Sequence, residues 1–376
     1  MSTRAILLSA SVAVLYALGL LMVFNTTSAE IINQSLNADV HGVLYKQIAF
    51  SFIGAMLGAV AYRLGYDRLL SWSVPILATV TALLLLVYVP GIGQKVNGAR
   101  RWLSLFGFSF QPSECAKLAI PAVFIRWLLI QKEQISFRSF CQILIALTFP
   151  IALILLEPDN GTTAIILFSL LVLFVLGKIT PKFWAWPLLV LCCFGAAAAY
   201  QMPHVHHRIE VYLHPELDLL GKGHQPHQAK IAAGSGGLLG RGIGESLQKL
   251  NYLPEAQNDY VAAIFAEETG FLGMLLLIGL YAIFMYAGFG IALNARDRAG
   301  FLIASLLTTL VAIQAFLNLG IVSGLLPSKG MTLPFFSQGG SSLMINIAAV
   351  FILLDIDRKC RTQQLYSFRS KTPTKT

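Results

Sequence analysis

The sequence predicts an all-α integral membrane protein of about ten transmembrane helices, with both termini in the cytoplasm. Of its 376 residues, 56% are hydrophobic and only 12% are charged, and the mean hydropathy is +0.70. Several apolar runs reach the ~20 residues that an α-helix needs to cross a bilayer. Basic residues recur in the alternate connections between these runs, and the positive-inside rule assigns those connections to the cytoplasm.

Ten apolar runs define the expected helices in order along the chain. They cover residues 5–24, 43–62, 69–89, 112–131, 139–156, 162–177, 183–201, 260–288, 300–324 and 339–356. The first run could instead be a signal peptide, with Thr27-Ser28-Ala29 as a weak cleavage site, but its length favours an uncleaved span. Residues 1–356 would then form a single polytopic membrane domain, and residues 357–376 a basic cytoplasmic tail apposed to the membrane.

The distribution of basic side chains orients the chain and limits its partners. The residues expected on the inside are Arg4, Arg63, Arg68, Lys132, Arg138, Lys178, Lys182, Arg296, Arg298, Arg358, Lys359, Arg361, Arg369, Lys371 and Lys375. Outside, basic residues concentrate in residues 95–101 and in a long loop, residues 202–258, between spans seven and eight. Because these two clusters face away from the cytoplasm, they argue against nucleic acid and favour an anionic substrate at the outer membrane surface.

The long outside loop, residues 202–258, exceeds the length of a simple connector and is therefore expected to be functional. Its glycine run, residues 234–242, lacks the GxxxxGK[ST] pattern of a phosphate loop. Turn formation and close backbone packing explain this run better. The histidines of the loop match no metal-ligand spacing, and the five cysteines of the chain form no CxxC pair, so neither a structural metal nor a disulfide framework is indicated.

Two outside connections combine charged residues with helix-start chemistry. Arg100 and Arg101 precede the fourth span, and arginine suits phosphate because its planar fork donates two parallel hydrogen bonds. Pro112 and Glu114 suit the first turn of that span, so a well-capped helix with an interfacial arginine pair explains the segment as well as anion binding does. Asp159 lies in the turn before the sixth span, where we expect chiefly helix capping, with Asp159 or Asn160 as the N-cap.

Acidic residues gather between residues 251 and 273, where the long loop meets the eighth span. An ionised carboxylate at the mouth of a membrane helix is costly to hold, so Asp259 is a functional candidate. The alternative is that Asp259 serves only as a helix N-cap. Glu267 and Glu268 lie further along the same helix, and we expect them to be buried hydrogen-bonding groups that fix its packing.

The last outside connection, residues 324–342, contains two prolines and four glycines, which indicate a shaped, re-entrant loop. Lys329 is its only charged residue. A lone lysine at this depth is often an interfacial side chain that extends its ammonium to water. Beside Asp259, it would instead be a counter-ion or a phosphate ligand.

Six motifs, taken together and in order, resemble the SEDS family of bacterial cell-wall polymerases, the FtsW, RodA and SpoVE group. The matching stretches are NGARRW, QPSE, EPDNGT, GKGHQPHQAKIAAGSGGLLGRGIGES, YLPEAQNDYVAAIFAEETGFLG and LLPSKGMTLPFFSQGGSS. Each stretch alone is a weak signal, whereas six in register are specific. The PSKGMTLP stretch is more similar to the FtsW branch than to the RodA branch.

This resemblance implies a peptidoglycan glycosyltransferase that polymerises lipid II at the outer face of the bacterial cytoplasmic (inner) membrane. The implied partners are a class B penicillin-binding protein transpeptidase and other divisome or elongasome membrane proteins. The family's essential aspartate falls on Asp259, and the expected substrate contacts are Arg100, Arg101, Glu114, Asp159, Gln228, Glu255, Lys329 and Ser341. The chain departs from the family pattern at Gln257-Asn258, at Tyr260, at Glu157, where glutamine is usual, and at Gln338, where tyrosine is usual.

The implied reaction joins the 4-hydroxyl of an acceptor GlcNAc to the anomeric carbon of a donor MurNAc and expels undecaprenyl pyrophosphate. Asp259 would accept the hydroxyl proton as general base, and Arg100, Arg101 and Lys329 would stabilise the leaving pyrophosphate. A divalent cation, Mg²⁺ or Mn²⁺, held in part by Asp259, could share that role. Two alternatives remain: a lipid II flippase, which needs a continuous polar path to the inner face, and a non-catalytic scaffold of the wall-synthesis complex.

Overall fold

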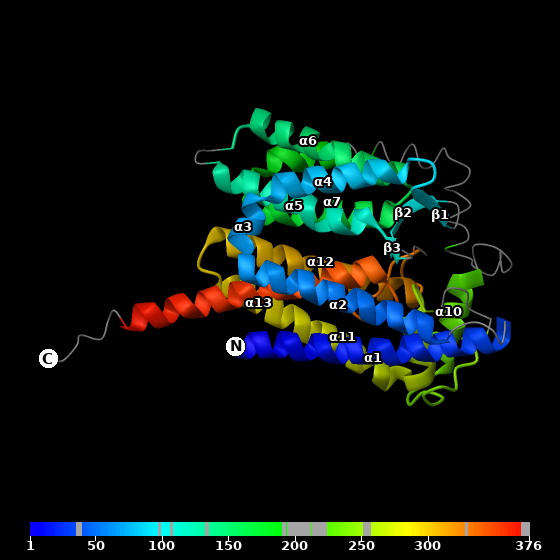
Figure 1. Ribbon diagram of the computed structural model, residues 1–376. Coiled ribbons are helices and arrows are strands. Elements are labelled where there is room, and N and C mark those ends of the chain that lie inside the picture. Colours follow the sequence, from blue (N-terminus) through cyan, green and yellow to red (C-terminus); the bar gives the residue numbers. More distant parts are fainter. Residues whose placement is uncertain are drawn as a thin grey trace.

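The computed structural model describes residues 1–34, 40–96, 99–105, 108–131, 135–189, 193, 212, 224–250, 257–327 and 330–369 (Figure 1). Its helices are α1 (Thr3–Gln34), α2 (Val40–Leu64), α3 (Tyr66–Ser71), α4 (Ser73–Val87), α5 (Pro112–Ile130), α6 (Phe137–Leu156), α7 (Asn160–Leu176), α10 (His224–Ser235), α11 (Val261–Asn294), α12 (Arg298–Val322) and α13 (Gly340–Arg369). Its strands are β1 (Gly93–Val96), β2 (Ala99–Leu105) and β3 (Phe108–Phe110).

Most of the described helices fall on predicted spans, whereas α10 lies in the predicted long outside loop. Six of them are long and apolar enough to cross a membrane: α1, α2, α6, α11, α12 and α13. The third predicted span divides at Trp72 into α3 and α4, while α5 and α7 match the fourth and the sixth. The seventh, residues 183–201, is helical up to residue 189 and continues largely outside the described residues. The protein is therefore a mostly helical, multi-pass integral membrane protein, as predicted.

The start of the chain lies beside the C-terminal part of α13. The Ser2 hydroxyl donates to the Asp357 carboxylate at 2.5 Å, and the Arg361 guanidinium donates to the Met1 carbonyl at 3.2 Å. The strands and α10 lie at the opposite end (Figure 1). The molecule thus has a terminal end, where these contacts lie, and a sheet end.

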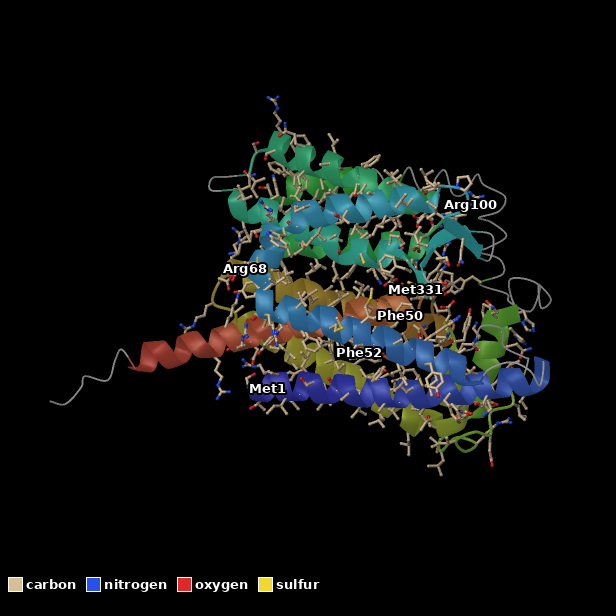
Figure 2. All side chains as sticks on the ribbon, viewed as in Figure 1. Met1, Phe50, Phe52, Arg68, Arg100 and Met331 are labelled. Atoms are coloured by element: carbon tan, nitrogen blue, oxygen red, sulfur yellow. The ribbon has the colours of Figure 1, made fainter. Side chains whose placement is uncertain are left out.

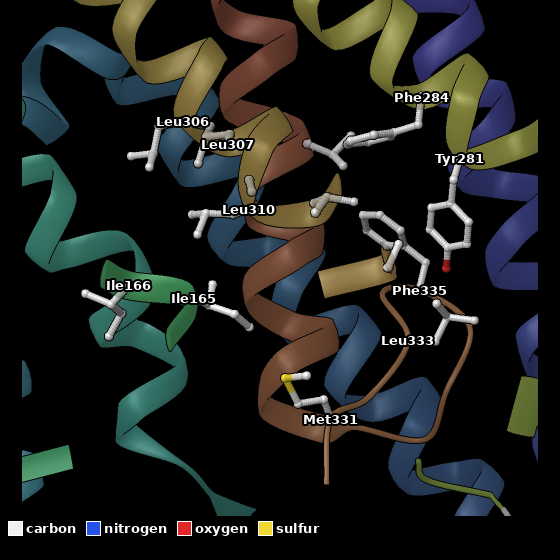
Figure 3. Close-up of a cluster of buried hydrophobic side chains, with 14 of the residues drawn as sticks. Ile165, Ile166, Tyr281, Phe284, Leu306, Leu307, Leu310, Met331, Leu333 and Phe335 are labelled. Atoms are coloured by element: carbon white, nitrogen blue, oxygen red, sulfur yellow. The ribbon is translucent and has the colours of Figure 1, made fainter. Parts of the chain in front are cut away.

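The helices form two groups, α3–α7 and α1–α2 with α10–α13 (Figure 1). Apolar side chains fill the space between the groups: Figure 3 shows Ile165 and Ile166 of α7 across from the leucines 306, 307 and 310 of α12. Within the second group, α2 and α13 approach closely because Gly58 has no side chain and leaves room for the Phe351 ring. A Cβ atom added to Gly58 would lie only 2.5 Å from that ring. Small residues thus set the distance between spans here.

A three-stranded antiparallel sheet connects α4 to α5, and the sequence analysis did not anticipate it. Gln94 pairs with Trp102 between β1 and β2, and Leu103 pairs with Phe110 between β2 and β3. The sheet places Arg100 and Arg101 on its central strand and ends directly before Pro112, the first residue of α5. The two candidate arginines are therefore fixed by a strand rather than by an irregular loop.

Helix α11 is interrupted at Gly270, whose φ of 66° suits glycine rather than residues with a Cβ. The glycine-rich residues 236–242 fill the interruption. The backbone amides of Arg241 and Gly242 donate to the carbonyls of Glu267 and Glu268 at 3.0 Å each. A Cβ at Gly240 would lie 2.1 Å from the Glu268 carbonyl oxygen, so only glycine fits at this approach. The predicted close backbone packing of the glycine run is confirmed.

Candidate functional site

Asp259 lies directly before α11, facing the connection between α12 and α13. The N-cap residue of α11 is Tyr260, whose side chain makes no cap hydrogen bond, and Asp259 lies one residue before it. Gly330 of that connection approaches the Asp259 side chain closely. A Cβ atom added to Gly330 would lie 3.0 Å from the Asp259 carboxylate oxygen Oδ2. Asn318 fixes the backbone on both sides of this approach, because its Nδ2 donates to the Asp259 carbonyl at 2.8 Å and to the Met331 carbonyl at 2.6 Å.

The connection between α12 and α13 forms a shaped loop over residues 330–339. The Ser337 hydroxyl accepts from the Leu333 amide at 2.8 Å, and the Tyr281 hydroxyl donates to the Pro334 carbonyl at 2.6 Å. The loop residues Phe335 and Phe336 are fully buried, and Figure 3 shows Phe335 in the buried apolar cluster with Tyr281 and Leu333. The loop also pairs with the chain just before Asp259, since the Gln338 amide donates to the Gln257 carbonyl at 3.0 Å. This loop is therefore a fixed wall of the Asp259 site.

Asp159 connects the turn between α6 and α7 to the start of α5. It caps α7, as predicted, by accepting a hydrogen bond from the Thr162 amide at 3.2 Å. Its second oxygen accepts from the Gln111 side-chain amide at 3.0 Å and from the Ser113 hydroxyl at 3.1 Å. The Gln111 backbone amide in turn donates to the Ser341 hydroxyl at 2.9 Å. Asp159 and Ser341 thus meet at the first turn of α5.

Met331 links the Asp159 turn to the Asp259 side of the site. The Met331 side chain packs against Gly161 in the first turn of α7, where an added Cβ atom would lie 3.2 Å from it. The Met331 carbonyl accepts a hydrogen bond from Asn318, which also donates to the Asp259 carbonyl. Figure 2 shows Met331 between the two groups of helices, near the sheet end. Asp159, Ser341 and Asp259 therefore converge on one loop, although they are far apart in sequence.

The two candidate arginines differ in their surroundings. Arg101 donates from Nε to the Glu157 carbonyl at 2.9 Å and from Nη2 to the Pro158 carbonyl at 2.6 Å. It therefore holds the sheet against the turn that carries Asp159. Arg100 is exposed on β2, opposite Lys95 in the sheet register, at the sheet end of the molecule (Figure 2). Of the pair, Arg100 is the one whose charge faces the surroundings of the protein.

Glu157, at the C-terminal end of α6, is almost completely buried, with 1% of its surface exposed. Within the described part of the chain, neither of its carboxylate oxygens has a hydrogen-bond partner. Burial, reinforced by the nearby Asp159 carboxylate, raises the pKa of the Glu157 carboxyl to about 8, and Arg101 opposes this shift. A buried acid with such a pKa is neutral over much of the pH range in which an ordinary carboxylate is charged.

A buried polar chain, which the sequence analysis missed apart from Glu114, joins α5 to α12 and to the last loop. Glu114 pairs with Lys117 at 2.6 Å, and the Lys117 ammonium donates to the Gln314 side-chain carbonyl at 3.2 Å. Gln314 donates onward to the Thr332 carbonyl at 3.0 Å and to the Ser342 hydroxyl at 3.2 Å. The signal in the sequence was a Glu–Lys pair three residues apart inside an apolar span, where charges usually have a function.

The remaining candidates are placed in part. Glu255 and Lys329 lie outside the described residues, although Gly330, the chain neighbour of Lys329, contacts the Asp259 side. Gln228 is half-buried on α10, which packs against α11 and α12. In the described ranges, no three His, Cys, Asp or Glu side chains gather as a metal site would require. Glu267 and Glu268 are buried and hydrogen-bonded within the protein, as expected.

Similar proteins agree with this architecture. The probable peptidoglycan glycosyltransferase FtsW of Trichlorobacter lovleyi is 37% identical over 358 residues, which cover 92% of this chain and 91% of the relative. The corresponding protein of Legionella pneumophila is also 37% identical, over 93% of this chain and 90% of its own length. Stage V sporulation protein E of Bacillus subtilis is 38% identical over 84% of this chain and 87% of its own length.

Two solved structures share the fold over nearly the whole chain. One comes from a peptidoglycan synthase complex described as coordinating polymerization and crosslinking; it has a TM-score of 0.76, 27% identity, and coverage of 94% of this chain and 97% of that chain. The other is the rod shape determining protein RodA of Thermus thermophilus, with a TM-score of 0.63, 27% identity, and coverage of 94% and 96%. The family model described as "Cell cycle protein" matches residues 5–362. The chain therefore belongs to the FtsW/RodA/SpoVE family of cell cycle proteins.

Proposed function

We propose that this protein is a peptidoglycan glycosyltransferase that polymerises lipid II into glycan strands. The observation that carries the proposal is the placement of Asp259: its carboxylate faces Gly330 in a fixed loop, and Asn318 holds the backbone on both sides. A general base must keep a fixed position relative to the proton that it accepts. Relatives that carry the name peptidoglycan glycosyltransferase over nine tenths of their length support the same reaction.

In the proposed reaction, the 4-hydroxyl oxygen of the acceptor GlcNAc attacks the anomeric carbon of the donor MurNAc. The bond from that carbon to the undecaprenyl pyrophosphate breaks, and the hydroxyl proton passes to the Asp259 carboxylate. Positive charge beside the leaving pyrophosphate stabilises the developing negative charge. Arg100, exposed on β2, and Lys329, adjacent in the chain to Gly330, are the candidates for that charge, whereas Arg101 is engaged with the turn that carries Asp159.

A divalent cation would fit this chemistry only with substrate as a further ligand. The described residues bring no three acidic, histidine or cysteine side chains together. Mg²⁺ commonly binds through one or two carboxylates together with substrate phosphates, so Asp259 and a pyrophosphate form a suitable donor set. When bound, the ion would supply positive charge to the leaving group.

The proposed location is the bacterial cytoplasmic (inner) membrane, with the site at its outer face. Arg358, Lys359 and Arg361 lie at the terminal end, which the positive-inside rule assigns to the cytoplasm, and the Asp259 site lies toward the sheet end. The proposed partner is a class B penicillin-binding protein transpeptidase, alongside other divisome or elongasome membrane proteins. A similar chain in a peptidoglycan synthase complex that also crosslinks supports this pairing.

The test is to incubate the purified protein with lipid II, with and without the transpeptidase, and to separate glycan polymers by gel electrophoresis. We expect polymer from the wild type and none from Asp259→Ala or Asp259→Asn, both of which should fold and bind the partner. Asp67→Asn, an exposed carboxylate at the terminal end, is the matched control and should remain active. Normal polymerisation by Asp259→Asn would refute the assignment, and movement of lipid II across vesicles without polymer would instead indicate a flippase.

A further inference from the structure

Residues 236–250, which we call the clamp loop, expose their large apolar side chains and bury two polar ones, Ser246 and Lys249, while Arg241 and Glu245 are exposed. Leu238, Leu239 and Ile243 are 72%, 78% and 69% exposed. Ser246 and Lys249, in the same loop, are buried. This distribution is the reverse of that in a loop surrounded by water, where lysine is almost never buried and large apolar side chains seldom gather on the surface.

The buried polar side chains of the clamp loop bind the two glutamates of α11. The Ser246 hydroxyl donates to Glu267 at 2.5 Å. The Lys249 ammonium donates to Glu268 at 3.1 Å and to the Asn25 side-chain carbonyl of α1 at 2.7 Å. The buried polar side chains of the loop are thus engaged with the protein, whereas its outward surface carries the leucines and the isoleucine beside the exposed Arg241 and Glu245.

The backbone of the clamp loop is also paired at the point where these side chains project. The amides of Phe271 and Leu272 in α11 donate to the carbonyls of Gly237 and Leu238 at 2.9 Å and 3.2 Å. In the opposite direction, the amide of Arg241 donates to the Glu267 carbonyl at 3.0 Å. Irregular backbone can contact lipid only where its polar groups have such partners, because hydrocarbon offers none.

The exposed leucines continue the lipid-facing surface of α11. Phe271, Leu272 and Leu275 are all exposed on this membrane-spanning helix, directly beyond the interruption at Gly270. The helix from Gly270 to Asn294 rises about 36 Å at ~1.5 Å per residue, which already exceeds the ~30 Å hydrocarbon core. Gly270 and the clamp loop therefore lie at the boundary of the bilayer rather than in bulk water. Figure 1 shows the loop beside the α11 segment nearest the sheet end.

We propose that the clamp loop is a membrane anchor that inserts Leu238, Leu239 and Ile243 among the acyl chains of the nearer leaflet. A lipid surface fits better than a protein partner because the apolar side chains are continuous with the lipid-facing side of α11. The anchor holds the interruption at Gly270 at a fixed depth. It thereby fixes the buried segment 261–268, which begins two residues after Asp259.

The test measures membrane depth at single spin labels. Leu239→Cys, Glu245→Cys and Leu275→Cys are introduced separately into the full chain, with the native cysteines replaced by alanine, and reconstituted in phosphatidylethanolamine–phosphatidylglycerol vesicles. Glu245 is an exposed polar residue of the same loop and serves as the matched aqueous control, whereas Leu275 on α11 is the lipid reference. We expect the label at residue 239 to collide with oxygen several-fold more often, relative to a water-soluble nickel chelate, than the label at residue 245.

If the ratio of oxygen collisions to nickel-chelate collisions at residue 239 equals the ratio at residue 245, the proposed membrane anchor is refuted. It is also refuted if the label at residue 239 meets the nickel chelate in vesicles and becomes shielded only when the crosslinking partner is added, because that result identifies a protein-docking surface. The measurement needs no catalytic activity, so its outcome is independent of the polymerisation assay. All three labels occupy exposed positions, and a monodisperse elution profile confirms that each variant is folded.

Discussion

Glu157→Gln should stabilise the protein, and the gain should grow as the pH rises. Glu157 is buried without a hydrogen-bond partner among the described residues, and its pKa is raised from 4.5 to about 8. Below pH 4.5 the acid is neutral in both the folded and the unfolded chain, so the glutamate carries no penalty. Between pH 4.5 and 8 the unfolded chain releases the proton and the folded chain retains it, so stability falls with rising pH across this window and is constant above it. Glutamine keeps the shape of the neutral acid at every pH.

The size of the gain in stability follows from the shift in the pKa of Glu157. A full shift from 4.5 to about 8 corresponds to about 5 kcal/mol. Relaxation of the turn and entry of water lower this value, so we expect a gain of about 2 kcal/mol at pH 8 and near zero at pH 4.5. The groups that face Glu157 are Asp159 on the α6–α7 turn, Arg101 on β2 and Tyr88 at the end of α4, and all three are unchanged in the variant.

The assay is thermal unfolding in detergent at a series of pH values, followed by intrinsic fluorescence, with wild type and Glu157→Gln measured side by side. The difference between the two midpoints should increase from pH 4.5 to 8 and then level off. Glu245→Gln, which changes an exposed carboxylate, is the control and should show a small difference at every pH. A constant difference between wild type and Glu157→Gln, or a wild type that gains stability relative to the variant with rising pH, would show that the buried acid is not held neutral.

Three further substitutions test the contacts around the site. Gly330→Ala places a methyl group 3.0 Å from the Asp259 carboxylate and should lower the polymerisation rate with little change in unfolding midpoint; an unchanged rate would show that this approach is not part of the site. Asn318→Leu leaves the carbonyls of Asp259 and Met331 without their donor and should cost about 1–3 kcal/mol, measured by thermal unfolding; no loss would exclude the bridge. Lys117→Met leaves Glu114 buried and unpaired and should cost about 3–5 kcal/mol, most of which the added Glu114→Gln should restore; an undiminished loss in the double variant would argue against the ion pair.

The sequence predicted features that depend on local composition and missed those that depend on distant partners. The spans were predictable because length and apolarity alone select membrane helices. The Asp159 cap and the close packing of the glycine run also follow from local chemistry. The sheet at residues 93–110 was missed because its strands are short and their register depends on pairing rather than on a strong alternation. The interruption at Gly270 was missed because a glycine near a helix turn is no sufficient signal of a break, and the backbone pairing with the clamp loop explains it.

In the candidate site too, features that depend on local sequence were predictable and contacts between distant residues were not. Lys117 and Gln314 are 197 residues apart in the chain, and nothing local to either residue indicates that they meet. Asp259 was identified by its position at the mouth of a span and by the resemblance of its flanking motif, both of which are readable in sequence. Its position one residue before the N-cap Tyr260 and opposite Gly330 came only from the structure.

The two carboxylates that converge on Met331 have different proposed roles, one structural and the other catalytic. Asp159 accepts hydrogen bonds from Thr162, Gln111 and the Ser113 hydroxyl, so it acts as a cap and a link between helices. Asparagine also caps helices well. Asp159→Asn should therefore fold and polymerise within a few-fold of wild type, whereas Asp259→Asn should lose polymerisation by about 10²–10⁴ because an amide cannot accept the hydroxyl proton. Equal losses in the two variants, measured on the same lipid II gel, would mean that Asp259 too is a structural residue and that the base lies elsewhere.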